Sequence, residues 1–437
     1  MKRQLINLFQ VCVLLGIFFP VIIFAGPTLT LTTDKKNACY ELGEKIGWHA
    51  EVHGDGAAGI KTARYVLKEG GGKIIGQGEV TFQAGAGNFQ TTLNEPGTIL
   101  AEISATNGSH HLIHALAGAA VASAQIGISS PCPDDFDAFW TGKLKELAAV
   151  PENPVLKKEN SGRNGVDYWK ITLDNIRGTH IQGQLARPTS GKKFPAMLVV
   201  QSAGVYPLDK AWATGPAASG WLVLNILAHD LPIDEPKAFY DDLTQHALTN
   251  YTAIGSDDRE KSYFLRMFLA CSRAVDYLSE RPDWNGQTLI VTGTSQGGLQ
   301  SFVAAGLNPK VTALLALVPA GCDNTGGLVG RKPGWPYWIA NGAGRDPQKL
   351  LETARYFDGV NFAARIKCPA LIGFGLIDTT ATPSGILAAA NQIHAPKELV
   401  MMPDSDHLGH DNTQAPFTAR AAVWRAALLA GEPAPVK

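Results

Sequence analysis

Short runs in which apolar and polar residues alternate fill the first third of the chain. Turn-forming residues separate these runs, as at Gly70-Gly71-Gly72, Asn94-Glu95-Pro96 and Asn107-Gly108. An alternation with a period of two is typical of strands with one buried face. It predicts strands at Thr28 to Thr33, Lys45 to Val52, Thr62 to Lys68, Glu79 to Gln83, Gly97 to Ala105 and Ala117 to Val121. Strands at this spacing predict a small antiparallel sandwich of immunoglobulin-like type over residues 26–130.

The pattern changes after Pro131 to Pro133. Apolar residues at helical spacing predict a helix that Asp134 or Asp135 caps and that runs through Leu147. A second helix is predicted over Asp258 to Leu278. Continuous apolar runs alternate with helical stretches, as in a parallel sheet covered on both faces. These runs are Ala196 to Gln201, Leu222 to Ile226, Leu289 to Thr292, Ala313 to Val318, Ala370 to Phe374 and Leu399 to Met402. Residues 131–437 are therefore predicted to form one α/β domain.

One of these strands runs into a chemically distinctive turn. Gly293-Thr294-Ser295-Gln296-Gly297 fits G-x-S-x-G, the nucleophile elbow of α/β-hydrolases, between a predicted strand and a predicted helix. The glycines give the strained turn the space it needs, and Ser295 becomes the candidate nucleophile. The backbone N–H of Gln296, at the helix start, is a candidate oxyanion donor. The alternative is a glycine-rich turn with an incidental serine.

A serine nucleophile needs a base and an orienting acid, which follow it in the order acid then histidine in this fold. Asp378 follows the strand Ala370 to Phe374, and His407 follows the next strand. The carboxyl ends of parallel strands share one edge of the sheet, so these side chains are predicted to meet Ser295. Competing candidates are His410 for the base and Asp404 or Asp406 for the acid. His394 precedes its predicted strand, which puts it at the opposite end of the sheet. A surface-loop role without catalysis is the alternative for His407.

The second oxyanion donor is expected in the loop after an early strand. Val199-Val200-Gln201-Ser202-Ala203-Gly204-Val205 ends such a strand, and Gly204 would let a substrate oxygen approach the Val205 N–H. An ordinary tight turn is the alternative here.

Composition narrows the function further. The chain has 437 residues, 45% apolar and 18% charged, and a formal charge of −1, so it lacks a basic field for nucleic acid. No close Cys/His cluster indicates a metal, and no cofactor is implied. Five cysteines remain if Cys12 is removed with the N-terminal targeting segment described next. His110, His111 and His114 could form a ligand cluster, but no carboxylate or cysteine stands among them in the sequence, and a polar loop is the preferred interpretation.

Residues 1–25 are predicted to form a targeting segment. Lys2 and Arg3 precede an apolar run from Val11 to Phe24, and cleavage near Ala25 would leave a secreted or periplasmic protein without a membrane contact. A retained membrane anchor is the alternative.

Several motifs together resemble the acetyl xylan esterase and cephalosporin C deacetylase family, carbohydrate esterase family seven. The resemblance runs from Cys132 to His407, and its specific elements are Gly293-Thr294-Ser295-Gln296-Gly297-Gly298, Tyr356-Phe357-Asp358, Arg365-Ile366-Lys367-Cys368-Pro369 and Gly375-Leu376-Ile377-Asp378-Thr379. It implies an α/β-hydrolase fold, a triad of Ser295, Asp378 and His407, and oxyanion donors at Gln296 and Val205.

The chain also departs from the family pattern. Val205 stands where the family has tyrosine, Asp406 where glycine usually precedes the histidine, and Ala381-Thr382-Pro383 where two prolines are usual. The N-terminal sandwich lies outside the family's usual minimal unit. These departures favour a divergent, exported subgroup.

The sequence therefore predicts a secreted serine esterase that removes acetyl groups from carbohydrates such as xylan fragments. Alternatives are another hydrolase of this fold (a peptidase, lactone hydrolase or glucuronoyl esterase) and a non-catalytic carbohydrate-binding protein. A sugar platform would use Trp212, Trp335, Tyr337 and Trp338, for which plain packing is the other interpretation. The sugar, the acyl limit and a possible homo-oligomer stay open, as does the role of Gly330 to Gly344 as a lid or subunit contact.

Overall fold

The computed structural model describes residues 26–106 and 110–437. The predicted targeting segment and the predicted turn at Asn107-Gly108 lie outside the described residues. In the part of the chain that is described, no helix combines the length and apolarity needed to cross a membrane.

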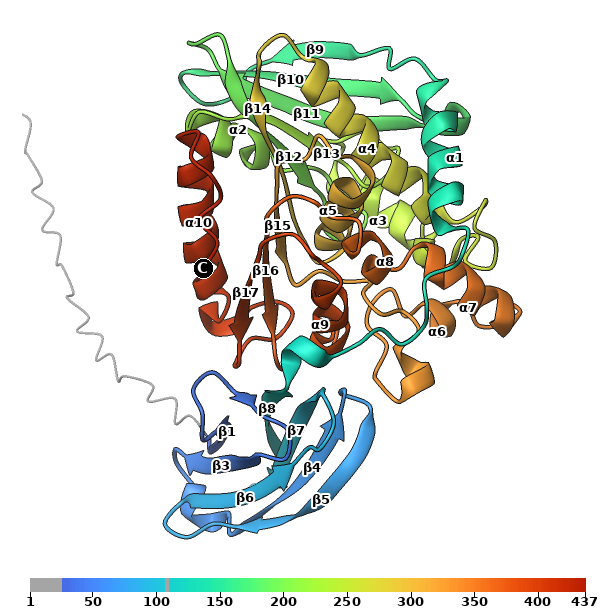
Figure 1. The fold of residues 1–437 in the computed structure, drawn as a ribbon. Coiled ribbons are helices and arrows are strands. Elements are labelled where there is room, and N and C mark those ends of the chain that lie inside the picture. The colour runs from blue at the N-terminus through green and yellow to red at the C-terminus, as the bar shows by residue number, and fades with distance from the viewer. Residues whose placement is uncertain (1–25, 107–109) are drawn as a thin grey trace, which may run out of the picture.

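Residues 28–121, here called the N-terminal β unit, form two sheets that enclose a common core (Figure 1). One sheet has the order β1-β3-β6 and the other β2-β8-β7-β4-β5. Their strands are β1 (Thr28–Thr33), β2 (Cys39–Tyr40), β3 (Lys45–His53), β4 (Thr62–Glu69), β5 (Lys73–Thr81), β6 (Ala86–Thr92), β7 (Gly97–Thr106) and β8 (Leu112–Val121). Trp48, Ala101 and Ile103 are almost completely buried between the sheets.

The alternating pattern predicted several strands of this unit with the right bounds, but β5 covers Lys73–Thr81 where a strand at Glu79 to Gln83 is predicted, and β8 begins at Leu112 rather than Ala117. Sequence analysis missed β2 and β6, because β2 is only a two-residue strand and β6 is mostly polar. The prediction of a purely antiparallel arrangement was wrong at one place: β2 pairs in parallel with β8. The immunoglobulin-like type stays a prediction.

A nine-stranded mixed sheet organises the rest of the chain, in the order β17-β16-β15-β14-β12-β13-β11-β10-β9. Its strands are β9 (Val155–Glu159), β10 (Val166–Asp174), β11 (His180–Pro188), β12 (Phe194–Val200), β13 (Leu222–Ile226), β14 (Trp284–Thr294), β15 (Ala313–Leu317), β16 (Ala370–Gly375) and β17 (Lys397–Met402). The block from β13 to β17 is parallel, whereas β9, β10 and β11 pair antiparallel with their neighbours. This crossed strand order with an antiparallel edge is an α/β-hydrolase-like arrangement; sequence analysis did not predict β9 to β11.

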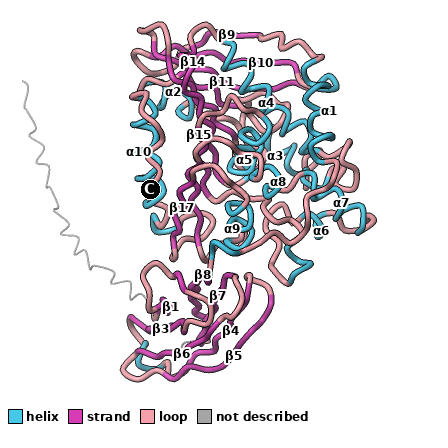
Figure 2. The backbone as a smooth tube through the Cα atoms, viewed as in Figure 1, coloured by secondary structure: helices cyan, strands magenta, loops and turns pink. Residues whose placement is uncertain are grey.

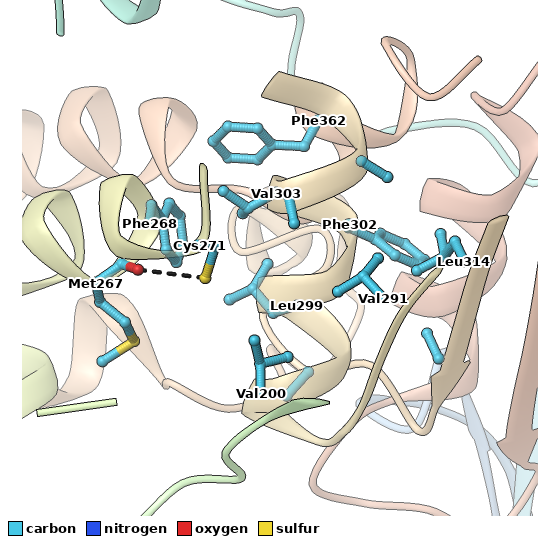
Figure 3. Packing of buried hydrophobic residues seen from close by; sticks show 14 of the residues in the cluster. Val200, Met267, Phe268, Cys271, Val291, Leu299, Phe302, Val303, Leu314 and Phe362 are labelled. Carbon is cyan, nitrogen blue, oxygen red and sulfur yellow. Dashed lines mark hydrogen bonds between the residues drawn. The ribbon is translucent and has the colours of Figure 1, made fainter. Parts of the chain in front are cut away.

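Helices cover both faces of this sheet (Figure 2). They are α1 (Phe136–Ala148), α2 (Ala211–Ala218), α3 (Lys237–Gln245), α4 (Tyr263–Glu280), α5 (Gln296–Leu307), α6 (Trp338–Asn341), α7 (Pro347–Tyr356), α8 (Gly359–Ala363), α9 (Pro383–Asn391) and α10 (Ala415–Leu429). Alternate residues of β12 point to opposite layers: Leu198 packs in the core beneath α4 and α5, and Met197 in the core beneath α2 and α10. Figure 3 shows the first of these cores, where Leu299 and Phe302 of α5 lie between the sheet and α4.

Two helix starts differ from the sequence prediction. Asp135 precedes α1, but its carboxylate does not cap the helix; it accepts hydrogen bonds from Tyr356 and Arg259 instead. The long helix begins at Tyr263 rather than Asp258, because the intervening residues form a turn in which the N–H groups of Lys261 and Ser262 donate to Asp258 O. Distant partners therefore explain why Asp135 does not cap α1, and a local turn explains the late start of α4.

The N-terminal β unit lies against the carboxyl end of β16 (Figure 1). A Cβ built on Gly118 of β8 would sit 2.4 Å from the Cβ of Leu376, so the two backbones are in close contact. The N–H of Lys332 donates to Gly70 O at 3.0 Å. The unit thus touches the loop that carries Asp378.

Candidate active site

The nucleophile elbow forms where β14 ends and α5 begins. Ser295 has φ of 58° and ψ of −120°, a strained conformation for a residue with a side chain. Its neighbours allow the turn because a Cβ on Gly293 would lie 2.4 Å from Gly297 O, and one on Gly297 would lie 2.6 Å from Val200 O. No side chain fits at either position, so the glycines of the motif are sterically required.

Backbone hydrogen bonds hold the strained serine in place. Its N–H donates to Leu317 O at 2.9 Å, and its carbonyl accepts from Leu299 and Ala320, both at 3.1 Å. Ser295 is therefore tied to the end of β15 as well as to its own helix.

The structure brings Ser295, His407 and Asp378 together. His407 Nε2 lies 2.9 Å from Ser295 Oγ, and His407 Nδ1 lies 2.7 Å from Asp378 Oδ2. Since a carboxylate only accepts, Nδ1 carries the proton and Nε2 accepts from the serine hydroxyl. This order of hydrogen bonds is the one in which a histidine activates a serine.

Asp378 is held in a loop after β16. Its side chain is buried, and Oδ1 accepts from the N–H groups of Thr380 and Ala381, both at 2.8 Å. A Cβ on Gly375 would lie 1.9 Å from Ser405 O, so this glycine lets the acid loop and the histidine loop approach each other. Backbone N–H groups of the same loop thus orient the Asp378 carboxylate toward His407.

The competing residues lie elsewhere. His410 is exposed and pairs with the Asp406 carboxylate, which raises the pKa of His410. Asp404 is exposed, and His394 lies exposed between α9 and β17. None of these side chains is hydrogen-bonded to Ser295 or His407 in residues 26–106 and 110–437.

The loop after β12 lies beside the elbow. Ser202 Oγ donates to Thr294 O at 2.9 Å, and the Gln201 side chain donates to Tyr206 O at 2.9 Å. Gly204 has φ of +114°, a conformation that disfavours side chains. Within residues 26–106 and 110–437, neither the N–H of Val205 nor that of Gln296 donates to a backbone carbonyl, so both amides are left as candidate donors.

Two residues that the sequence motifs do not include connect these donor segments. Tyr251 donates to Gln296 Oε1 at 2.6 Å, and His229 contacts Gly204 O at 3.0 Å. Neither residue belongs to a motif, and no local signal in the sequence marks them, because the contacts form only between distant segments.

The candidate sugar-platform aromatics divide into two groups. Trp338 is buried and donates to Ser256 O, and Trp335 packs edge-on against Phe264, so plain packing accounts for both. Trp212 is 39% exposed and lies against Tyr206, and Tyr337 is partly exposed. The segment from Gly330 to Gly344 connects the N-terminal β unit to the acid loop, since Lys332 bonds Gly70 and the N–H of Trp335 donates to Thr380 O at 2.7 Å.

The described residues contain no group of three or more His, Cys, Asp or Glu side chains placed to hold a metal ion. The five cysteines in this part of the chain are free thiols.

Comparison with known proteins places this geometry in a family. The sequence model described as acetyl xylan esterase (AXE1) matches residues 127–426, which include Ser295, Asp378 and His407. The chain belongs to the acetyl xylan esterase family. The N-terminal β unit lies outside the matched residues.

One curated protein is similar to this chain in sequence, and two solved structures are similar to it in fold. The acetyl esterase Axe7A of Xylanibacter ruminicola is 35% identical over 279 residues, and the match covers 63% of this chain and 63% of that protein. The acetyl xylan esterase from Paenibacillus sp. R4 has a similar fold, with a TM-score of 0.58 at 22% identity over 68% of this chain and 98% of that one. Acetyl xylan esterase 1 from Thermoanaerobacterium sp. gives 0.56 at 23% identity, over 68% and 97% of the two chains.

Proposed function

We propose that this protein is a serine esterase that removes acetyl groups from hydroxyls of carbohydrates, through Ser295, His407 and Asp378. The observation that carries the proposal is the continuous hydrogen-bond chain from Asp378 through His407 to Ser295, in a chain of the acetyl xylan esterase family. The similarity to an acetyl esterase supports acetyl esters as substrates.

In the first half-reaction, Ser295 Oγ attacks the acetyl carbonyl carbon while His407 Nε2 takes its proton. The carbonyl oxygen becomes an oxyanion, which the N–H groups of Gln296 and Val205 stabilise. Asp378 stabilises the imidazolium through Nδ1. The sugar oxygen then leaves with the proton from Nε2, and the acetyl group stays on Ser295.

In the second half-reaction, His407 takes a proton from water, which attacks the acetyl-serine carbonyl. The same two amides stabilise the second tetrahedral intermediate, and acetate leaves as Ser295 regains its proton. Each step uses only groups of this chain and water.

The proposal includes the organisation of the chain. Residues 1–25 would direct export and residues 26–130 would form an immunoglobulin-like domain. Residues 131–437 would form the catalytic domain of a secreted or periplasmic enzyme. The separate core of the N-terminal β unit supports the domain division.

Acetate release from acetylated xylo-oligosaccharides and from 4-nitrophenyl acetate tests this function. The mature protein should release acetate from both substrates, and Ser295→Ala should lose both activities. Ser301→Ala is the matched control, since Ser301 lies one helical turn or more away and its hydroxyl bonds only Gly297 O among the described residues. Retained activity in Ser295→Ala, or an inactive native protein, would contradict the proposal.

A further inference from the structure

A buried imidazole that the proposed mechanism does not use lies next to the candidate oxyanion loop. His229 follows β13 and is 2% exposed. Its Nε2 lies 3.0 Å from Gly204 O, and its Nδ1 lies 2.7 Å from the hydroxyl of Tyr263. Both ring nitrogens therefore have a partner.

These partners decide where the ring carries its proton. A backbone carbonyl only accepts, so Nε2 must donate to Gly204 O, and Nδ1 then accepts from the Tyr263 hydroxyl. Burial lowers the pKa of His229 to about 4, so the ring is neutral at ordinary pH. The imidazole is thus a fixed hydrogen-bond donor aimed at one carbonyl.

That carbonyl belongs to the peptide whose other end is the candidate oxyanion donor. In a planar trans peptide, the C=O of Gly204 and the N–H of Val205 point in opposite directions. A bond that fixes the carbonyl on the His229 side therefore turns the Val205 N–H to the other side. Glycine tolerates many backbone conformations, so without such a bond the Gly204–Val205 peptide could rotate and withdraw the donor.

From this geometry we infer that His229 is a positioning residue that locks the Gly204–Val205 peptide with its N–H directed into the oxyanion hole. The inference rests on the proposed function of Val205. It adds a residue from the loop after β13 that touches neither the substrate nor the triad.

A second contact couples this lock to the other donor. Tyr251 packs edge-on against His229, with ring centroids 4.9 Å apart, and its hydroxyl donates to Gln296 Oε1. The N–H of Gly204 approaches the same hydroxyl at 3.4 Å. The segments that carry the two oxyanion donors are therefore joined through Tyr251.

Two substitutions by amide side chains distinguish a hydrogen-bonding role of His229 from a role in packing alone. The amide nitrogen of glutamine lies about as far along its side chain as imidazole Nε2, so His229→Gln keeps a donor for Gly204. The amide of asparagine reaches only as far as Nδ1, so His229→Asn loses that donor while keeping a polar side chain. The two variants differ by one methylene group.

We expect His229→Gln to keep kcat for 4-nitrophenyl acetate within about threefold, and His229→Asn to lower it roughly 100-fold with KM little changed, as for loss of one oxyanion donor. Inhibition by phenylboronic acid, which forms a tetrahedral anion on the serine, should weaken in parallel with kcat. Urea unfolding of both variants measures the purely structural contribution. Equal kcat values in the two variants, or losses that follow only their stabilities, would overturn the lock.

Crystal structures of the two variants test the inference independently of activity. His229→Asn should show the Gly204–Val205 peptide rotated or in two orientations, and His229→Gln should show it as in the native protein. An unrotated peptide in His229→Asn would refute the lock even in an active esterase. Activity that survives Ser295→Ala would instead refute the proposed function and leave the peptide measurement valid.

Discussion

Ser295 and Asp378 belong to the same candidate site, but the segments that carry them are held in different ways. The serine segment is fixed within the central sheet: Gly293 and Gly297 clear the turn, and β15 binds its backbone. Every one of these contacts comes from within the residues that the family model matches.

The segment that carries Asp378 depends on contacts from further away. Leu376 packs on Gly118 of the N-terminal β unit, and Thr380 O accepts from Trp335. Lys332, three residues before Trp335, bonds Gly70 of the same unit. A small cavity at this boundary is lined by Leu100, Lys332 and Asp378.

Among the described residues, the N-terminal β unit thus contacts one of the two segments and not the other. The Ser295 segment is held by contacts from within the family match, whereas the Asp378 segment also contacts Gly118, which lies outside it. Substitutions in the Ser295 segment and at the contact between the Asp378 segment and the N-terminal β unit should therefore lower activity by different amounts.

The largest effect is expected for Asp378→Asn. An asparagine amide can donate to His407 Nδ1 and favour the wrong tautomer, so kcat should fall by about 10⁴-fold. Asp404→Asn, on the exposed part of the histidine loop, should leave kcat unchanged. The measurement is kcat for 4-nitrophenyl acetate, and comparable losses in both variants would argue against a specific role of Asp378.

His229, which bonds the loop beside Ser295, should make the stability of the protein depend on pH. The pKa of His229 falls from 6.5 to about 4 on folding because the ring is buried. Between these values the unfolded chain binds the proton and the folded one does not, so the free energy of unfolding decreases as pH falls. The loss should approach about 3 kcal/mol by pH 4.

Urea unfolding at pH 7.5 and 4.5 measures this loss in the free energy of unfolding. The reference is His229→Gln, whose side chain does not titrate. The native protein should lose more stability than the variant over this range. The same loss in both proteins would mean that His229 does not supply it.

Gly297→Ala should be the next most harmful change. Its Cβ would overlap Val200 O, which must displace the elbow from the oxyanion loop, so kcat should fall roughly 100-fold. Gly215→Ala in α2 is the control, because a Cβ there meets no atom within 4 Å. An active Gly297→Ala variant would show that the elbow tolerates a wider turn than the structure indicates.

Gly118→Ala should have a smaller effect on the acid side. The added Cβ would overlap Leu376, and the N-terminal β unit can shift in response, so we expect a loss in kcat of about tenfold. Gly127→Ala, where a Cβ meets no atom within 4 Å, serves as the control. Unchanged activity in Gly118→Ala would mean that the unit does not support the acid loop.

The site was more predictable than its surroundings. Ser295 could be found because its chemistry requires a specific glycine spacing, and Asp378 and His407 because parallel strands end at one edge of the sheet. His229 and Tyr251 could not be found in this way, since a buried donor has a meaning only once its distant partner is known.

The fold shows the same limit. Strong alternation predicted β1 and β7 almost to the residue, whereas the mostly polar β6 forms a strand because it completes the sheet next to β3. The Gly, Pro and Trp content of residues 330–344 leaves a lid or a subunit contact open, and in the structure Lys332 and Trp335 of this segment bond Gly70 and Thr380. Composition describes what a segment can do locally, and tertiary contacts decide among these possibilities.

The proposed mechanism requires Ser295 to carry the acetyl group during turnover. Rapid acid quenching of the enzyme with 4-nitrophenyl acetate, followed by peptide mass spectrometry, tests it directly. We predict that the peptide containing Ser295 gains the mass of one acetyl group, and that the gain disappears in Ser295→Ala. Acetyl transfer to another residue, or hydrolysis at the native rate in Ser295→Ala, would contradict the account.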